Sequence, residues 1–231
     1  MLKLKVVATG SSGNCYLLKS EHGTLVLDCG VPIRTIKSAL DWRVCDISAV
    51  LVSHIHADHS KSVADFEKMG ITVWKPYLDD KKIQRKHFGD FTVTCFDVPH
   101  NGVENRGFLI ESDGQKILYA TDFEYIPYNF RKNQINHFII ECNYDSDHVD
   151  KDAVNFQHKV MGHASLSTAL GILEANVTDA CQTVLFVHMS DFGVESDKCI
   201  GLVRKVAKNA DIYIASYGLE LELFGKSEVP F

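Results

Sequence analysis

The chain has 231 residues, a formal net charge of −6 and a hydrophobic fraction of 45%. This length and composition predict a single globular α/β domain over residues 1–231 with a sizeable core. No apolar run approaches the roughly 18 residues that span a bilayer, and the N-terminus lacks the apolar stretch of a signal peptide. We therefore expect a cytoplasmic protein with no membrane partner. The seven cysteines form no C-x-x-C pair, which argues against a disulfide framework or a thiolate zinc site.

Hydrophobic periodicity predicts mostly strands in the first half of the chain, with helices between some of them. Pro32 is a typical first residue of a helix, and Gly70 is a typical stop. In chain order we expect strands over 2–8, 15–19 and 24–29, a short helix to Leu40, a buried strand over 47–53, a helix over 60–69, a short strand near Val73, a helix near 78–88, a strand over 91–98 and a hairpin around 112–114.

The second half alternates strands with longer helices. The expected elements are a strand over 137–142, helices over 150–160 and 166–176, a strand over 183–188, a helix over 195–208 and a strand over 211–217. The tail 219–231 alternates like an edge strand, which could pair across a homodimer. This mixture predicts two mixed sheets packed together with helices outside, each half of the chain contributing one sheet.

The sequence SHIHADHS follows directly on the apolar strand 47–53. It places His54, His56, Asp58 and His59 within six residues. Neutral imidazoles and a carboxylate suit zinc and similar divalent ions. A loop held at one strand end can curl so that all four side chains point to one spot, whereas a regular helix or strand cannot. The motif therefore predicts a metal site.

Three further residues of metal-binding type come at the ends of apolar strands. His100 ends FTVTCFDVPH, Asp122 ends KILYATD and His188 ends TVLFVH. Ligands at the same end of neighbouring strands converge on one rim, where binding sites commonly form. The sequence therefore predicts that these three residues join the H-x-H-x-D-H loop.

This string, followed by His, Asp and His at strand ends, resembles the metallo-β-lactamase superfamily over nearly the whole chain. LDCG at 27–30 resembles the family's first signature. The resemblance implies an αββα sandwich with two metal ions at one sheet edge, two Zn²⁺ or alternatively Mn²⁺. It also implies that Asp28 orients the loop without binding metal. By the same resemblance, the first metal is held by His54, His56 and His100, the second by Asp58, His59 and His188, and Asp122 bridges the two.

Three segments narrow the branch of the superfamily. GSSGNCYLL (10–18) and ECNYD (141–145) resemble YycJ-type hydrolases, and GHASLSTALGILEA (162–175) resembles the ribonuclease Z signature. In that nuclease branch the histidine of the signature, here His163, donates a proton to the leaving oxygen. Glu141 is expected to polarise His163, so Asp58, His163 and Glu141 are the candidate catalytic residues. Only 21 residues lie between His100 and Asp122, so the long tRNA-binding arm of ribonuclease Z is absent.

The resemblance thus implies a phosphodiesterase with a nucleotide substrate. A small 3′,5′-cyclic nucleotide is the first choice, because the acidic chain and missing arm are similar to the compact, dimeric anti-Pycsar enzymes. A YycJ-like DNA exonuclease is the alternative, followed by a lactone or thioester hydrolase. A non-catalytic binding module is disfavoured because all seven ligands are present. Residues that could contact a phosphate are Asn101, Arg106 and Ser190, although ordinary loop hydrogen bonding is the favoured role of Asn101. Residues that could stack on a base are Tyr16, Phe123, Tyr125 and Tyr144, although isolated aromatics more often belong to the core or its rim.

Overall fold

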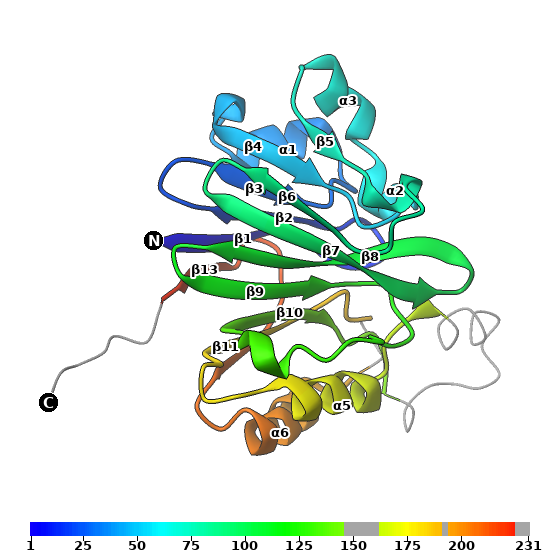
Figure 1. Ribbon diagram of the computed structural model, residues 1–231, viewed down its shortest axis with the longest axis vertical. Helices are drawn as coiled ribbons and strands as arrows, with labels where there is room; N and C mark the ends of the chain where they lie inside the picture. Colours follow the sequence, from blue (N-terminus) through cyan, green and yellow to red (C-terminus); the bar gives the residue numbers. More distant parts are fainter. Residues whose placement is uncertain (146–161, 191–193, 225–231) are drawn as a thin grey trace, which may run out of the picture.

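Two β-sheets lie face to face in the computed structural model, which describes residues 1–145, 162–190 and 194–224 (Figure 1). The first sheet has the strand order β13 (Glu220–Leu223), β1 (Leu2–Ala8), β2 (Cys15–Lys19), β3 (Thr24–Leu27), β4 (Ile47–Leu51) and β5 (Val73–Trp74). The second has the order β12 (Asp211–Ile214), β11 (Thr183–Val187), β10 (His137–Glu141), β9 (Gln115–Ala120), β8 (Val103–Ser112), β7 (Phe91–His100) and β6 (Gln84–Phe88). Each sheet contains both parallel and antiparallel pairs, as the sequence predicted.

The central strands bury both of their faces, because successive side chains of a strand point to opposite sides. In β4, Ala49 and Leu51 pack in the core between the two sheets, whereas Val50 packs in a second core on the outer face. In β10, Ile139 faces the core between the sheets, and Ile140 faces outward to a third core. The chain therefore has three apolar layers, one between the sheets and one on each outside.

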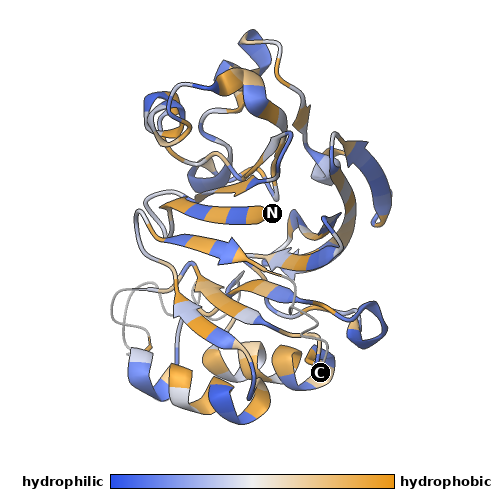
Figure 2. Ribbon diagram, turned by 90° about the vertical axis from the view of Figure 1, so that its left-hand side faces the viewer, coloured by the Kyte–Doolittle hydropathy of each residue, from blue (hydrophilic) through white to orange (hydrophobic). Residues whose placement is uncertain are grey.

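Helices cover both outer faces and complete an αββα arrangement (Figure 1). On the first sheet, Ile36 and Phe66 of two helices pack against Val50. On the second sheet, Leu173 and Val203 pack in the core that includes Ile140, and the apolar sides of these two helices are visible in Figure 2. The helices are α1 (Ile33–Ala39), α2 (Ala57–Ser60) and α3 (Val63–Lys68) on the first sheet, and α5 (Leu166–Asn176) and α6 (Ser196–Val206) on the second.

The predicted division of the chain between the sheets is wrong. The second sheet begins at β6 and takes β6 to β8 from the first half of the chain, while β13 returns from the C-terminal end to pair with β1. The helix predicted near 78–88 is also wrong, because residues 84–88 form β6, paired antiparallel with β7. The helix predicted over 150–160 lies outside the described residues.

Several strands end at the same edge of the molecule. Strands β9, β10 and β11 run parallel, and β7 points the same way because two antiparallel pairings separate it from β9. Just beyond three strand ends the backbone turns through the left-handed region, at Asp28, Asp122 and His188, with φ of 56°, 53° and 51°. Asp and His tolerate this conformation better than most residues. The sharp turns hold these side chains at the edge of the sheets.

Candidate metal centre

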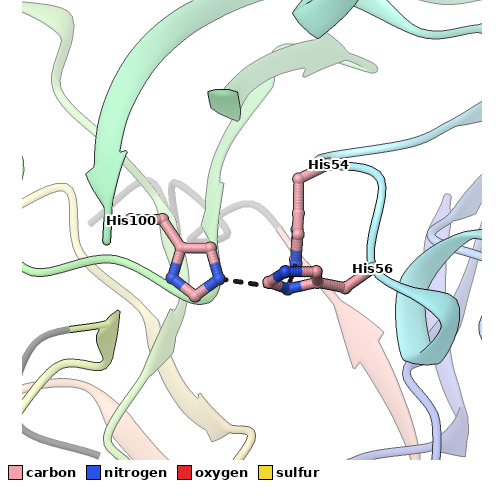
Figure 3. Close-up of side chains that lie close together, drawn as sticks. All are labelled: His54, His56 and His100. Atoms are coloured by element: carbon pink, nitrogen blue, oxygen red, sulfur yellow. Dashed lines mark hydrogen bonds between the residues drawn. The ribbon is translucent and has the colours of Figure 1, made fainter. Parts of the chain in front are cut away.

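Three imidazole rings converge at this edge (Figure 3). Nδ1 of His56 lies 3.0 Å from Nε2 of His54 and 3.2 Å from Nε2 of His100. His54 and His56 come from the loop between β4 and α2, and His100 is the last residue of β7. Three imidazole nitrogens bound to one tetrahedral zinc at about 2.0–2.1 Å would lie about 3.3 Å apart. The spacing therefore fits a shared cation.

The surroundings of these rings determine which nitrogens carry protons. Nδ1 of His100 lies 2.6 Å from the carbonyl oxygen of Gly162, which can only accept a hydrogen bond. Oγ of Ser53 donates to Asp28 and therefore accepts from Nδ1 of His54 at 3.0 Å. The lone pairs of His54 and His100 are thus on Nε2, and both point at Nδ1 of His56. One proton on that atom cannot satisfy two lone pairs, so the donor set fits a metal ion.

A second group of ligand-type residues surrounds the carboxylate of Asp122. Oδ1 of Asp122 lies 3.3 Å from Nε2 of His59 and contacts Nδ1 of His188 directly, while Oδ2 lies 3.9 Å from Nε2 of His54. Oδ2 of Asp58 lies 3.4 Å from Nε2 of His59. Asp122 therefore lies between the three-histidine group and the second group. The structure brings together all seven residues that the sequence predicted as ligands.

Burial and charge act differently on the two groups. Burial lowers the pKa of His54 and of His100, so both rings are neutral, as metal ligands must be. Burial also opposes protonation of His59, but the negative charges of Asp122 and Asp28 outweigh it and hold the pKa of His59 well above its usual value. The second group is therefore a place of excess negative charge that favours a cation.

Asp28 lies beneath this loop and is completely buried. Its carboxylate accepts hydrogen bonds from the backbone N–H of Ser53 at 2.8 Å, the Ser53 hydroxyl at 2.9 Å, Nδ1 of His59 at 2.9 Å and the Tyr119 hydroxyl at 2.6 Å. The bond to Nδ1 fixes the ring so that Nε2 of His59 is directed at the second group. These contacts would let Asp28 orient the His59 ring, which stays a prediction from the sequence.

His163 and Glu141 form a pair beside the metal-type cluster. Nδ1 of His163 lies 2.7 Å from Oε1 of Glu141, and the His163 ring makes edge contacts with His100 and His188 at centroid distances of 5.6 and 5.1 Å. Burial lowers the pKa of His163, but the charge and hydrogen bond of Glu141 outweigh this and raise it to about 9. Glu141 is completely buried, whereas the His163 side chain is 12% exposed. The carboxylate can therefore hold a protonated His163 at the edge of the site.

The sequence interpretation missed Asn14, which is completely buried in the GSSGN loop. Its side-chain amide lies 3.0 Å from Nε2 of His59, and its backbone N–H donates to the carbonyl oxygen of Asp58 at 2.7 Å. The amide oxygen accepts from the backbone N–H of Gly10 at 3.0 Å, which orients the NH₂ group toward His59. The family resemblance of GSSGNCYLL was the one signal that could have drawn attention to this residue.

Arg106 does not contact the site, contrary to the sequence interpretation. Its guanidinium is buried and donates to Asp97 and Glu104 at 2.8 Å each and to the carbonyl oxygen of Asp79 at 3.3 Å. It is a structural ion-pair residue of the β7–β8 hairpin, in which Asp97 and Arg106 are opposite each other. Asn101 is exposed and donates its backbone N–H to Glu124 at 2.8 Å, and Ser190 is half-buried.

Three of the four candidate stacking residues are unavailable to a base. Tyr16 and Phe123 are 0% exposed and Tyr144 is 7% exposed, so they belong to the core or to its border. Tyr125 is 53% exposed. It lies three residues after Asp122, on the segment that leaves β9.

Comparison with known proteins agrees with this geometry. Residues 8–122 match the family described as the Metallo-beta-lactamase superfamily. The crystal structure of the metallo-beta-lactamase fold protein YhfI from Bacillus subtilis superposes with a TM-score of 0.69 and 21% identity, covering 95% of this chain and 98% of that one. The chain is therefore a metallo-β-lactamase-fold protein. With its His/Asp cluster, it is a metal-dependent hydrolase of that superfamily.

Two curated relatives are similar at low identity. Exodeoxyribonuclease YycJ of Bacillus anthracis is 22% identical over 218 residues, which covers 82% of this chain and 83% of that protein. Anti-Pycsar protein Apyc1 of Paenibacillus harenae is 32% identical over 71 residues, which covers 28% of this chain and 30% of that protein. Among the described residues, no helix is long and apolar enough to cross a membrane.

Proposed function

We propose that this hydrolase cleaves a nucleotide phosphodiester, with His163 as the general acid. The observation that carries this proposal is the Glu141–His163 pair, in which Oε1 and Nδ1 lie 2.7 Å apart. The pair lies beside the metal-type cluster. An alkoxide is a poor leaving group, so phosphodiester cleavage gains from a positioned acid, whereas a thioester expels a thiolate, which needs one less. The pair therefore favours a phosphodiester over a thioester.

Two divalent metal ions fit the donor set, with Zn²⁺ the first expectation and Mn²⁺ the alternative. When bound, such ions supply a water nucleophile of lowered pKa and stabilise charge on the phosphoryl group. Asp28 and Ser53 orient the imidazoles that receive them. The proposed ligands are His54, His56 and His100 for one ion, Asp58, His59 and His188 for the other, and Asp122 between them.

The proton needed by the leaving oxygen comes from His163. Oε2 of Glu141 accepts from the backbone N–H groups of Phe123 at 3.1 Å and Ala164 at 3.0 Å, which fixes the carboxylate. Oε1 then accepts a hydrogen bond from the Nδ1–H group of His163, so the imidazolium carries its second proton on Nε2. That proton passes to the leaving oxygen as the P–O bond breaks, and Glu141 stabilises the imidazolium until then.

Two substrates remain within this class. Similarity to an exodeoxyribonuclease over four-fifths of both chains supports DNA, as does the resemblance of GSSGN and ECNYD to YycJ-type hydrolases. The net charge of −6 and the local similarity to an anti-Pycsar protein support a 3′,5′-cyclic mononucleotide. We rank DNA ends first on the extent of the match. The proposed compartment is the cytoplasm, and the proposed assembly is a homodimer that pairs through the outer edge of β13.

The test is a chromatographic assay of the full chain loaded with Zn²⁺ or Mn²⁺. One tube contains 3′,5′-cyclic mononucleotides, and another contains linear single- and double-stranded DNA. Shortened DNA with intact cyclic nucleotides supports the exonuclease, and linear mononucleotides with intact DNA support the cyclic nucleotide phosphodiesterase. Hydrolysis of a lactone or thioester substrate with neither of these products would overturn the proposal.

A further inference from the structure

Among the described residues, two large exposed apolar side chains lie within three positions of a predicted metal ligand. Ile55 is 62% exposed and Tyr125 is 53% exposed. The exposure of Ile55 has a structural explanation, because it lies between His54 and His56, whose rings both turn inward to the cluster. Single exposed apolar residues are common on protein surfaces. Exposure alone therefore assigns no role to Tyr125.

The backbone just before Tyr125 is held by two hydrogen bonds to the residues around His100. The N–H of Glu124 donates to the carbonyl oxygen of Pro99 at 2.8 Å, and the Glu124 carboxylate accepts from the N–H of Asn101 at 2.8 Å. Pro99 and Asn101 flank the ligand His100. Glu124, the residue before Tyr125, is thus hydrogen-bonded to both chain neighbours of His100, which belongs to the three-histidine group.

A third bond joins the same segment to the acid pair. The N–H of Phe123 donates to Oε2 of Glu141 at 3.1 Å, and the Phe123 ring is completely buried in the core beneath the second sheet. Tyr125 therefore follows two residues fixed by the ligand strand β7 and by the carboxylate that holds His163. Beyond it, Ile126 and Tyr128 pack against the same core. Because this backbone is already ordered, covering the exposed ring orders only its side-chain torsions and no loop.

We propose that Tyr125 is the base-stacking platform of the active site, an inference that rests on the proposed nucleotide phosphodiesterase. A nucleotide presents an anionic phosphodiester and, a few ångströms away, a flat apolar base. The metal cluster suits the first, and the Tyr125 ring suits the second. Stacking of a base on an aromatic side chain contributes about 1–3 kcal/mol and tolerates any base. Stacking on Tyr125 therefore predicts that the enzyme binds the flat face of the base and does not distinguish one base from another.

Stacking on Tyr125 should strengthen the binding of phosphodiesters that carry a base and leave the binding of base-free phosphodiesters unchanged. The test compares thymidine dinucleotide and a 3′,5′-cyclic thymidine phosphate with analogues in which hydrogen replaces the base. The metal-loaded full chain is assayed unmodified and as Tyr125→Ala and Tyr125→Phe. Trp42→Ala is the matched control, because Trp42 is 62% exposed but lies on the loop that leads into the opposite end of β4.

Tyr125→Ala is expected to raise KM for the base-containing substrate by about 5- to 150-fold, the equivalent of 1–3 kcal/mol, with kcat nearly unchanged. For the base-free analogues, Tyr125→Ala is expected to have the same KM as the unmodified protein. Tyr125→Phe and Trp42→Ala are expected to keep the KM of the unmodified protein for every substrate. An equal rise in KM for base-containing and base-free substrates, or no rise for either, would overturn the platform alone. Hydrolysis of neither substrate pair by the unmodified protein would overturn the proposed function, and the platform with it.

Discussion

Oδ2 of Asp28 lies 2.9 Å from Nδ1 of His59, and both side chains are completely buried. The carboxylate can only accept a hydrogen bond when ionised, so it keeps the His59 proton on Nδ1. The other nitrogen is then directed at Asp58 and Asp122. In the proposed metal site, Asp28 would therefore act through His59, as carboxylates behind metal-binding histidines commonly do.

The first prediction is that Asp28→Asn weakens metal binding at the second group by about 10–100-fold. The amide lacks the negative charge that raises the proton affinity of His59, and it cannot reproduce all four accepted hydrogen bonds. Metal affinity is measured by competition with a chromogenic chelator. Asp211→Asn is the control, because Asp211 is exposed at the start of β12. Unchanged affinity for both ions in Asp28→Asn would exclude the orienting role.

The second prediction concerns the acid pair. His163→Ala is expected to keep both metal ions and to slow phosphodiester cleavage by about 10²–10⁴-fold, the usual contribution of a general acid. Glu141→Gln is expected to slow it in the same direction, because the imidazolium loses its charged partner. A p-nitrophenyl phosphodiester, whose leaving group needs little protonation, should be cleaved nearly normally by His163→Ala. Equal losses on both substrates would remove His163 from proton transfer.

The third prediction follows from the contact between Gly30 and the metal loop. A Cβ atom at Gly30 would lie 1.6 Å from the carbonyl oxygen of Asp58 and 2.7 Å from the backbone nitrogen of His59. Because these are backbone atoms, Gly30→Ala must displace the loop that carries the ligands. We expect loss of metal and destabilisation by about 3 kcal/mol, at the upper end of the usual cost of overpacking.

Urea unfolding and metal analysis test this change against Gly171→Ala. Gly171 lies in α5 with nothing within 4 Å of the added Cβ. This control is expected to keep its metal and to gain about 0.5–1 kcal/mol, because alanine is the better helix former. A Gly30→Ala protein with full metal content would contradict the contact.

Much of the proposed site could be predicted because four of the seven proposed ligands lie at the ends of apolar runs. The run 47–53 locates His54, and three further strands locate His100, Asp122 and His188. The remaining three, His56, Asp58 and His59, follow His54 in the H-x-H-x-D-H motif. Local patterns of this kind depend on residues close together in the chain. The αββα fold followed from the same strands and from their family resemblance.

What could not be predicted depends on contacts between distant residues. Asn14 reaches His59 across 45 positions, so its role requires the packed fold. Arg106 lies opposite Asp97 in the register of β7 and β8 and donates to it. The sequence did not indicate that register. The β6 error was avoidable, since Gly89 (φ 57°) and Asp90 separate the paired residues Phe88 and Phe91 as a two-residue turn.

The last prediction concerns acid stability and His137, which is completely buried at the start of β10. Its Nε2 lies 3.2 Å from the side-chain oxygen of Gln115, and among the described residues its Nδ1 has no hydrogen-bond partner. Burial lowers the pKa of His137 to about 4, whereas an unfolded histidine titrates near 6.5. Between these values the unfolded state binds more protons than the folded state. The stability that neutral His137 permits is therefore complete above pH 6.5 and is lost as the pH falls toward 4, by about 3 kcal/mol in all.

His137→Gln removes the titrating group while keeping a donor for Gln115. Its free energy of unfolding, measured by urea denaturation from pH 7.5 to pH 4, should fall less steeply than that of the unmodified protein by this amount. The exposed His87→Gln is the control and should keep the original slope. Because metal release and carboxylate titration occur in all three proteins, the difference in slope isolates His137. Parallel pH profiles for His137→Gln and the unmodified protein would show that His137 binds its proton equally well folded and unfolded.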